Sequence, residues 1–182
     1  MLTRRVFVQG MIQLPLLGLL GGCGHSDDHK PSLLKPVAIH SGDECAVCGM
    51  LIERFAGPKG EAIRAGHPAL KFCSTRELVG WWLQPENQHQ PFSLYVHDMG
   101  HTNWDHPADS AFTDARKAWY VMGSDRTGAM GPTLGSFAQK TDANGFATAH
   151  GGKVMAFNDL NLNVMESLLR GHAMPGMSHP MG

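Results

Sequence analysis

The sequence predicts an α+β fold of two similar ββαβ units, followed by a C-terminal helix and a flexible tail. Two observations carry this prediction. Each half of the chain contains short apolar runs that are separated by Gly- and Pro-rich turns, as is typical of strands. Each half also contains one helical segment before its last strand. Each unit is expected to need its helix or the other unit to cover its sheet.

The first unit is predicted over residues 43–98. Its elements are a strand over 49–55, a strand over 61–72 with a kink at 66–68, a helix over 75–84 and a strand over 92–97. The kink is placed at Pro68, because Pro interrupts strand pairing. Ser74 and Glu77 have the Ser-x-x-Glu spacing of a capping box, which predicts the start of the helix, and Pro85 predicts its end.

A connector loop over residues 99–116, with Gly, Asn, Pro and several Asp, leads to the second unit over residues 117–170. The elements of the second unit are a strand over 117–122, a glycine-rich turn over 123–131, a strand over 133–138, a helix over 142–150, a strand over 153–157 and a tail helix over 162–169. Gly151 and Gly152 supply the expected end signal of the first helix in this unit. A loop as long as the connector is uncommon unless it is functional or mobile.

The N-terminus has the features of an export signal. Residues 1–22 combine a positively charged start, a short apolar stretch and small residues at the end. The small residues before Cys23 resemble the lipobox of bacterial lipoproteins, which implies a diacylated thiol there; a secreted protein without lipid is the alternative. Arg4 and Arg5 also resemble a twin-arginine signal, so the Sec and Tat routes both stay open. Residues 23–42 are polar and contain Pro, so we expect them to form a tether between the lipid anchor and the domain.

Residues 43–50, Asp-Glu-Cys-Ala-Val-Cys-Gly-Met, concentrate the chemistry of the sequence. Cys45, Cys48 and Met50 are soft sulfur donors, which suit Cu(I), zinc or an iron–sulfur cluster. The thioether favours Cu(I), because zinc takes thiolate, imidazole and carboxylate. The alternatives are a thiol oxidoreductase that uses Cys45 and Cys48, and a structural zinc site that adds Cys73 and a His. Without Cys23 the mature chain keeps three Cys, so at least one thiol is free or metal-bound.

Composition and motifs exclude several classes of function. The formal net charge is −1 at pH 7, and no basic patch indicates a nucleic-acid partner. No Ser-His-Asp pattern, phosphate-binding loop or dinucleotide motif is found, so we expect a binding protein and not an enzyme. The chain has 11 His and 11 Met against two Tyr. Residues 171–182 concentrate these donors and resemble the Met/His-rich segments of extracytoplasmic copper proteins.

The combination of motifs resembles the NosL family, which comprises lipid-anchored, copper-binding accessory proteins for nitrous oxide reductase. The matching elements, in order, are Asp43-x-Cys45-x-x-Cys48-Gly-Met50-x-Ile52, Gly57-Pro58, Phe72, Trp119-Tyr-Val, Gly123-Ser124, Ala129-Met130-Gly131, Phe137, Ala143 with Phe146, and Gly151-Gly152-Lys-Val. The resemblance implies two ββαβ units, similar in topology to part of an organomercurial lyase. It also implies one Cu(I) per chain and copper delivery to nitrous oxide reductase through a membrane-associated assembly complex. The lipid-anchored protein would then face the periplasm, and we expect its anchor in the outer rather than the inner membrane.

The resemblance further implies that Cys, Met and a His hold the Cu(I). Met50 and either Cys45 or Cys48 match the first motif, and Met130 lies in the second. The choice between the two Cys stays open, as does the role of Cys73. The candidates for the imidazole are four residues: His67, His97, His101 and His150.

Overall fold

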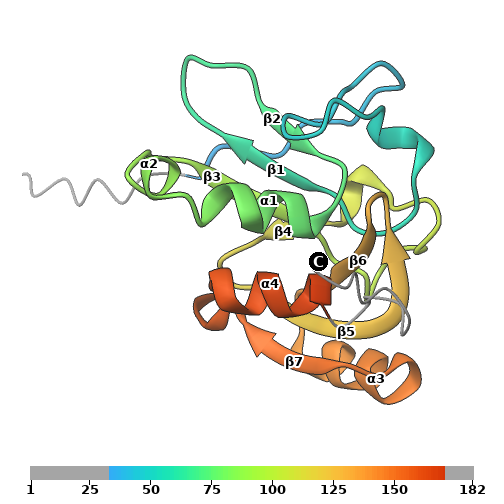
Figure 1. Cartoon of the computed structure of the whole chain (residues 1–182). Helices are drawn as coiled ribbons and strands as arrows, with labels where there is room; N and C mark the ends of the chain where they lie inside the picture. Colours follow the sequence, from blue (N-terminus) through green and yellow to red (C-terminus); the bar gives the residue numbers. More distant parts are fainter. Residues whose placement is uncertain (1–32, 171–182) are drawn as a thin grey trace, which may run out of the picture. The chain divides into compact units, whose positions relative to one another are not determined.

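The computed structural model describes residues 33–170, which form two antiparallel β-sheets and four α-helices (Figure 1). The predicted export signal, Cys23 and the Met/His-rich tail lie outside the described residues. No helix between residues 33 and 170 is long and apolar enough to cross a membrane. The predicted α+β class with two ββαβ units and a tail helix is confirmed.

The first sheet has the strand order β2-β1-β3-β4, and all its pairs are antiparallel. Its strands are β1 (Gly60–Ile63), β2 (Leu70–Phe72), β3 (Ser93–His97) and β4 (Phe112–Asp114). Two helices, α1 (Thr75–Trp82) and α2 (Pro85–Gln88), connect β2 to β3. The predicted capping box starts α1, because the Ser74 side chain accepts a hydrogen bond of 3.2 Å from the Glu77 N–H.

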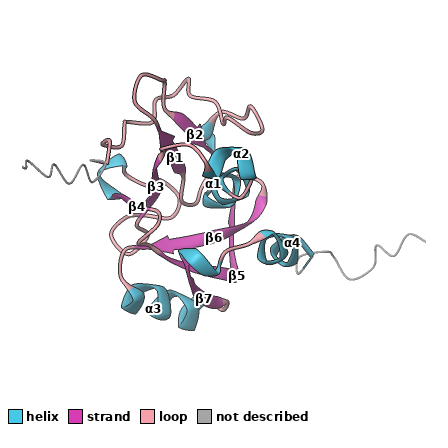
Figure 2. Ribbon diagram, turned by 90° about the vertical axis from the view of Figure 1, so that its left-hand side faces the viewer, coloured by secondary structure: helices cyan, strands magenta, loops and turns pink. Residues whose placement is uncertain are grey.

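The second sheet has the order β6-β5-β7. Its strands are β5 (Trp119–Gly128), β6 (Gly131–Phe137) and β7 (Lys153–Ala156). Helix α3 (Lys140–His150) contacts all three strands, and α4 (Leu162–Arg170) contacts α1 and β6. Figure 2 shows α3 and α4 at different sides of this sheet. The predicted turn over 123–131 is too long, since β5 continues to Gly128 with a register irregularity between Met122 and Thr127.

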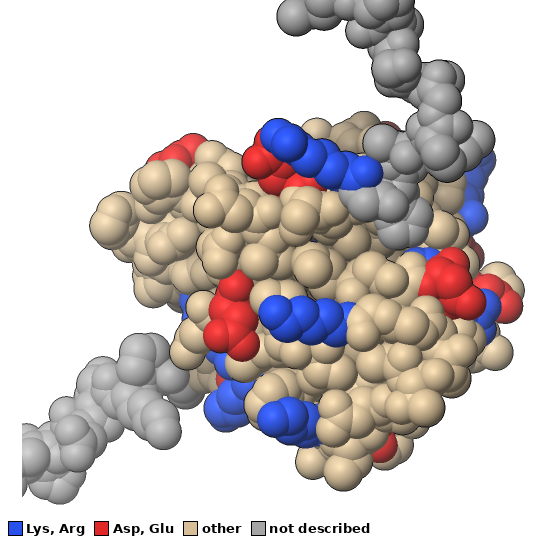
Figure 3. Space-filling model, turned by 60° about the horizontal axis from the view of Figure 1, so that its bottom comes forward, with Lys and Arg blue, Asp and Glu red and all other residues tan. Residues whose placement is uncertain are grey.

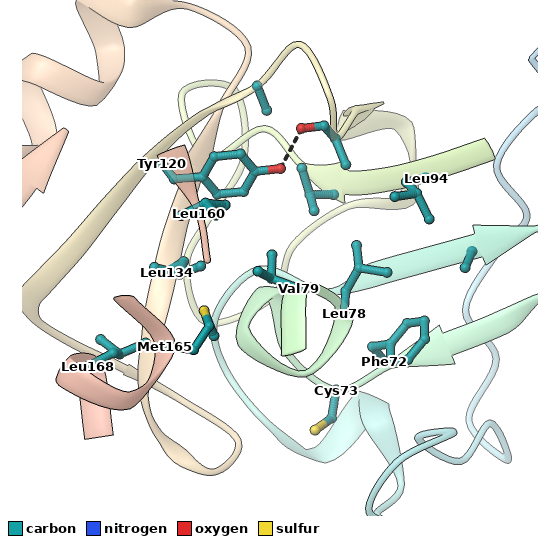
Figure 4. Packing of buried hydrophobic residues seen from close by; sticks show 14 of the residues in the cluster. Phe72, Cys73, Leu78, Val79, Leu94, Tyr120, Leu134, Leu160, Met165 and Leu168 are labelled. Carbon is teal, nitrogen blue, oxygen red and sulfur yellow. Dashed lines mark hydrogen bonds between the residues drawn. The ribbon is translucent and has the colours of Figure 1, made fainter. Parts of the chain in front are cut away.

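One hydrophobic core joins the two sheets, with α1 packed against both of them. The labelled residues in Figure 4 come from β2, α1, β3, β5, β6 and α4 and from the segments next to β2 and α4, and they share this core. Tyr120 lies within it, and its hydroxyl donates a hydrogen bond of 2.6 Å to the Ala115 carbonyl, so the buried polar atom is satisfied. Because both units contribute to one core, each unit covers the sheet of the other.

Two predictions for the first unit are wrong, and the errors compensate. Residues 49–55 are not a strand: Ile52–Arg54 is a 3₁₀ helix, and Glu44 and Leu51 form only an isolated bridge. Residues 61–72 are not one kinked strand but the antiparallel hairpin β1–β2. The chain reverses near Gly66, whose φ of +76° favours glycine. The order β-β-α-β is therefore right, although its strands are different ones.

The connector is also more ordered than expected, because β4 lies within residues 99–116 and pairs with β3. The described part of the predicted tether, residues 33–42, is bound to the first sheet and is not free. The Leu34 N–H donates to Ser93 Oγ at 3.0 Å, and the Val37 N–H donates to Glu61 Oε2 at 3.0 Å. The composition of this segment does not predict these contacts, because the side chains that accept its N–H groups are distant in the sequence.

Glu61, which accepts the Val37 N–H of this docked segment, makes the stability of the protein depend on pH. It is buried, and its second carboxylate oxygen has no hydrogen-bond partner among the described residues. Burial raises the pKa of Glu61 from 4.5 to about 7, against the opposing effects of the Val37 N–H and the Lys71 charge. Between these two values the folded protein binds more protons than the unfolded chain, so stability falls as pH rises through this window.

We therefore predict that the free energy of unfolding of the wild type falls by about 2–3 kcal/mol between pH 5 and pH 8 because of Glu61. The Glu61→Gln variant should lack this part of the pH dependence, since its side chain stays neutral. Urea unfolding of both proteins at each pH measures the difference. Parallel pH profiles of the two proteins would contradict the prediction.

Candidate metal centre

The Cys-x-x-Cys-Gly-Met motif lies in a narrow loop over residues 43–52 that turns back on itself. The Cys45 N–H donates to the Met50 carbonyl at 2.9 Å, and the Gly49 N–H donates to the Cys45 carbonyl at 2.8 Å. The Ile52 N–H closes the loop on the Asp43 carbonyl at 3.0 Å. Gly49 has a φ of +71°, which a residue with a side chain rarely adopts. This reversal places Cys45, Cys48 and Met50 in one compact segment.

This loop is fixed to the end of β2. The Ala46 N–H donates to the Lys71 carbonyl at 2.9 Å. The Lys71 ammonium group forms an ion pair with Asp43 and also donates to the Ala38 carbonyl at 2.6 Å. Cys73 follows β2 directly, between Phe72 and the helix cap Ser74. The contacts of Lys71 therefore bring Cys73 next to the loop.

The structure brings three thiols together. The sulfur atoms of Cys45, Cys48 and Cys73 lie within 4.8 Å of one another, and the Cys48 and Cys73 sulfurs are 3.6 Å apart. Cys45 is 3% exposed, Cys73 is fully buried and Cys48 is half-buried. Cys73 lies at the edge of the hydrophobic core, beyond Phe72 (Figure 4). The cluster thus has a buried side and one side that ligands can approach through Cys48.

The electrostatics of the cluster favour one thiolate at neutral pH. A hydrogen bond from the Cys73 thiol, together with backbone N–H groups of residues 47 and 48, lowers the pKa of Cys45 to about 4 against the opposing effect of burial. The same hydrogen bond and burial raise the pKa of Cys73. Lys59 is a buried cation whose pKa burial lowers to about 8, while the negative charge shared by the hydrogen-bonded Cys45–Cys73 pair acts in the opposite direction. A thiolate and a buried ammonium group therefore stabilise each other here.

The second predicted motif, with Met130, lies in the turn between β5 and β6. The Arg76 guanidinium group donates to the Met130 carbonyl at 3.0 Å and to the Pro132 carbonyl at 3.1 Å. Since Arg76 is in the first turn of α1, three residues after Cys73, it holds this turn beside the start of that helix. The neighbouring Ala129 packs against the core cluster that contains Cys45 and Cys73, whereas the Met130 side chain is 46% exposed.

None of the four candidate His residues joins the thiols, because the potential ligand group found within residues 33–170 consists of the three Cys alone. His67 is exposed beside Gly66 in the β1–β2 turn, His101 bonds to Asp98 at 2.8 Å, and His150 bonds to Asp125 at 3.0 Å.

His97 is buried, and its Nδ1 accepts the Lys59 N–H at 3.0 Å. Burial, followed by the charge of Lys59, lowers the pKa of His97 to about 3, so the ring is neutral and carries its proton on Nε2. Neither nitrogen of His97 is open to a metal.

The sequence predicts neither the place of Cys73 in the cluster nor the buried charge of Lys59. The positions of these two residues depend on the β1–β2 hairpin, where the sequence predicts a single strand. The one signal in the sequence was the odd number of Cys in the mature chain, which required a thiol without a disulfide partner. In the structure Cys45, Cys48 and Cys73 are all free.

A partly buried group of three thiols, with two Met in nearby turns, is a donor set that suits a soft metal. The chain belongs to the NosL family, whose model matches residues 36–165. It is 48% identical over 147 residues to the copper-binding lipoprotein NosL of Stutzerimonas stutzeri, which covers 81% of this chain and 76% of the relative. It is 37% identical over 117 residues to the copper-binding lipoprotein NosL of Achromobacter cycloclastes, over 62% of this chain and 61% of the relative.

The fold is also similar to the crystal structure of the copper chaperone NosL from Shewanella denitrificans. The TM-score is 0.69 at 47% sequence identity, and the match covers 71% of this chain and 97% of the solved one. The recognition of the family from its motifs is confirmed.

The role of Cys73 as a hydrogen-bond donor gives a prediction for the copper-free, reduced protein. Cys73→Ala removes the donor and should raise the pKa of Cys45 from about 4 toward the ordinary thiol range. Cys73→Ser is the matched control, because its hydroxyl keeps a donor in place. The ultraviolet absorbance of the thiolate, followed against pH, measures the change. Equal titration curves for the Ala and Ser variants would contradict this role.

Proposed function

We propose that this chain is a periplasm-facing Cu(I) chaperone that delivers copper for the maturation of nitrous oxide reductase. The observation that carries the proposal is the convergence of Cys45, Cys48 and Cys73 at the partly buried end of β2. The names of the relatives, copper-binding lipoprotein and copper chaperone, support copper as the cargo. Lipidation at Cys23 would keep the domain at the membrane.

The donor set fits Cu(I) better than zinc. Cu(I) is selected by thiolate and thioether ligands, whereas structural zinc sites are four-coordinate and commonly complete their shell with imidazole or a fourth thiolate. Three thiols converge within the described residues and no imidazole joins them. The Cys thiolates would hold the ion, and Met50, or Met130 in its place, would complete the sulfur shell as a thioether donor. Lys59 would compensate part of the negative charge that several thiolates bring to the site.

Release needs an open side. Cys48 is half-buried, and the adjacent Val47 and the Met130 turn are exposed, so an acceptor ligand can approach the ion from this side. Copper would then pass through a mixed-ligand intermediate, in which the acceptor replaces the protein sulfurs one by one. This transfer requires no general base and no covalent step, as expected of a carrier and not of an enzyme.

The proposed partners are nitrous oxide reductase and its membrane-associated assembly complex. The face in Figure 3 carries Lys and Arg interspersed with Asp and Glu over a mostly uncharged surface. Such a face offers no concentrated positive charge for nucleic acid.

A thiol oxidoreductase is the second candidate, and one observation favours it: the lowered pKa of Cys45 is typical of a reactive thiol. Two features weigh against it. Cys45 is buried, so its thiolate cannot reach a protein disulfide without movement of the loop. It also lies in a closed loop and not at the N-terminus of a helix. Rapid reduction of insulin disulfides by the copper-free protein would favour the oxidoreductase.

Copper titration of single variants tests the proposed ligands. Cys45→Ala, Cys48→Ala, Cys73→Ala and Met50→Ala should each weaken Cu(I) binding by more than about tenfold, or about 1.4 kcal/mol, because each removes a sulfur donor. Competition with a bathocuproine-type chelator under reducing conditions measures the affinity, and circular dichroism checks the fold. Met165→Leu is the matched control, since Met165 is buried in the core. Unchanged affinity in all four variants would refute the site.

A further inference from the structure

Within residues 33–170 the structure contains a cavity of about 310 Å³ that no Cys lines. It opens between the 3₁₀ helix Ile52–Arg54, the end of β3 and the connector segment 105–109. Its lining includes the buried residues Lys59 and His97 and several exposed charged residues. Cavities of this size hold small molecules in other proteins.

His97 lines this cavity and carries a buried hydrogen-bond donor without a partner in residues 33–170. The ring is 1% exposed and stacks on Phe112 at 4.1 Å between centroids, which fixes its plane. Its Nδ1 accepts the Lys59 N–H, so the proton of the neutral ring is on Nε2. Nε2 has no hydrogen-bond partner among the described residues. A buried donor without a partner destabilises the protein, and each such group requires an explanation.

Lys59 adds positive charge to the same lining. Its ammonium group donates to the Phe55 carbonyl at 2.5 Å and to the Ala56 carbonyl at 3.0 Å. An ammonium group has three donors, so one N–H is left. No carboxylate of residues 33–170 forms an ion pair with it. The buried part of the cavity therefore offers donors and a cation, which suit an oxygen that carries negative charge.

The exposed part of the lining has the opposite character. Three carboxylates lie there, those of Glu53, Asp105 and Asp109, together with the imidazole of His106. The Asp109 carboxylate also accepts the Ile39 N–H at 3.2 Å. These carboxylates repel a simple anion and attract a cationic group. A metal ion does not fit, because His97 Nε2 carries a proton and no three of these side chains converge within the described residues.

We propose that this cavity binds a small zwitterion of amino-acid size. Its carboxylate would accept hydrogen bonds from His97 Nε2–H and from Lys59, and its ammonium group would lie among Glu53, Asp105 and Asp109. The combination of buried donors and outer carboxylates matches a ligand that is negative at one end and positive at the other. No Cys of the described residues lines this site, although Lys59 also interacts with the thiol cluster. The zwitterion proposal does not rest on the proposed function.

The test uses the full-length, copper-free, ¹⁵N-labelled protein in detergent micelles. Glycine, acetate and methylammonium are titrated at constant ionic strength, and the ring nitrogens of His97 are followed by NMR. We expect glycine to shift the Nε2 signal with saturation and to bind at least about tenfold more tightly than acetate, while methylammonium leaves the signal unchanged. The double variant Glu53→Gln/Asp105→Asn should reduce the advantage of glycine over acetate, because it removes charge only from the exposed lining.

His67→Gln is the control, since His67 is exposed and does not line the cavity. It should bind glycine as the wild type does. His97→Phe, which keeps an aromatic ring against Phe112, should lose glycine binding. The proposal is overturned if glycine causes no saturable shift of His97, or if glycine and acetate bind equally and the double variant changes neither.

Discussion

The attachment of the 43–52 loop to the end of β2 is the constraint on which the metal centre depends. The Ala46 N–H bonds to the Lys71 carbonyl, and the Lys71 ammonium group pairs with Asp43. Without these contacts the loop would carry two Cys at one place and Cys73 would lie elsewhere on the hairpin. Because of these contacts, the sulfurs of Cys45, Cys48 and Cys73 lie close together without a bound metal. Such preorganisation reduces the cost of ordering the ligands when copper enters.

Charge connects the proposed copper site with the rest of the first sheet. Lys59 is buried, the thiol pair acts on its pKa, and its own charge lowers that of His97. A buried cation costs stability unless a negative group is near, and the single thiolate of the hydrogen-bonded Cys45–Cys73 pair is that group. Loading or removal of copper changes the charge of the thiols and hence the environment of Lys59. The thiols are therefore coupled to the buried charge of Lys59 in addition to being potential metal ligands.

Local signals in the sequence predicted most of the fold. The capping box of Ser74 and Glu77 placed the start of α1, and apolar periodicity with glycine end signals placed α3 and the strands of the second sheet. What could not be predicted depends on contacts between distant residues. The hairpin β1–β2 is decided by pairing with β3, and the docked segment near Leu34 depends on Ser93. Cys73 joins the site for the same reason, because it meets Cys48 across 25 residues of chain.

The central claim is that copper is held by sulfur in the cluster of Cys45, Cys48 and Cys73. X-ray absorption spectroscopy at the copper edge of the Cu(I)-loaded, full-length protein tests it most directly, because it reports both oxidation state and ligand type. We predict Cu(I) with a first shell of sulfur alone, and a loss of sulfur neighbours in the Cys73→Ala variant. A shell that contains imidazole nitrogen, or one that Cys73→Ala leaves unchanged, would contradict the claim.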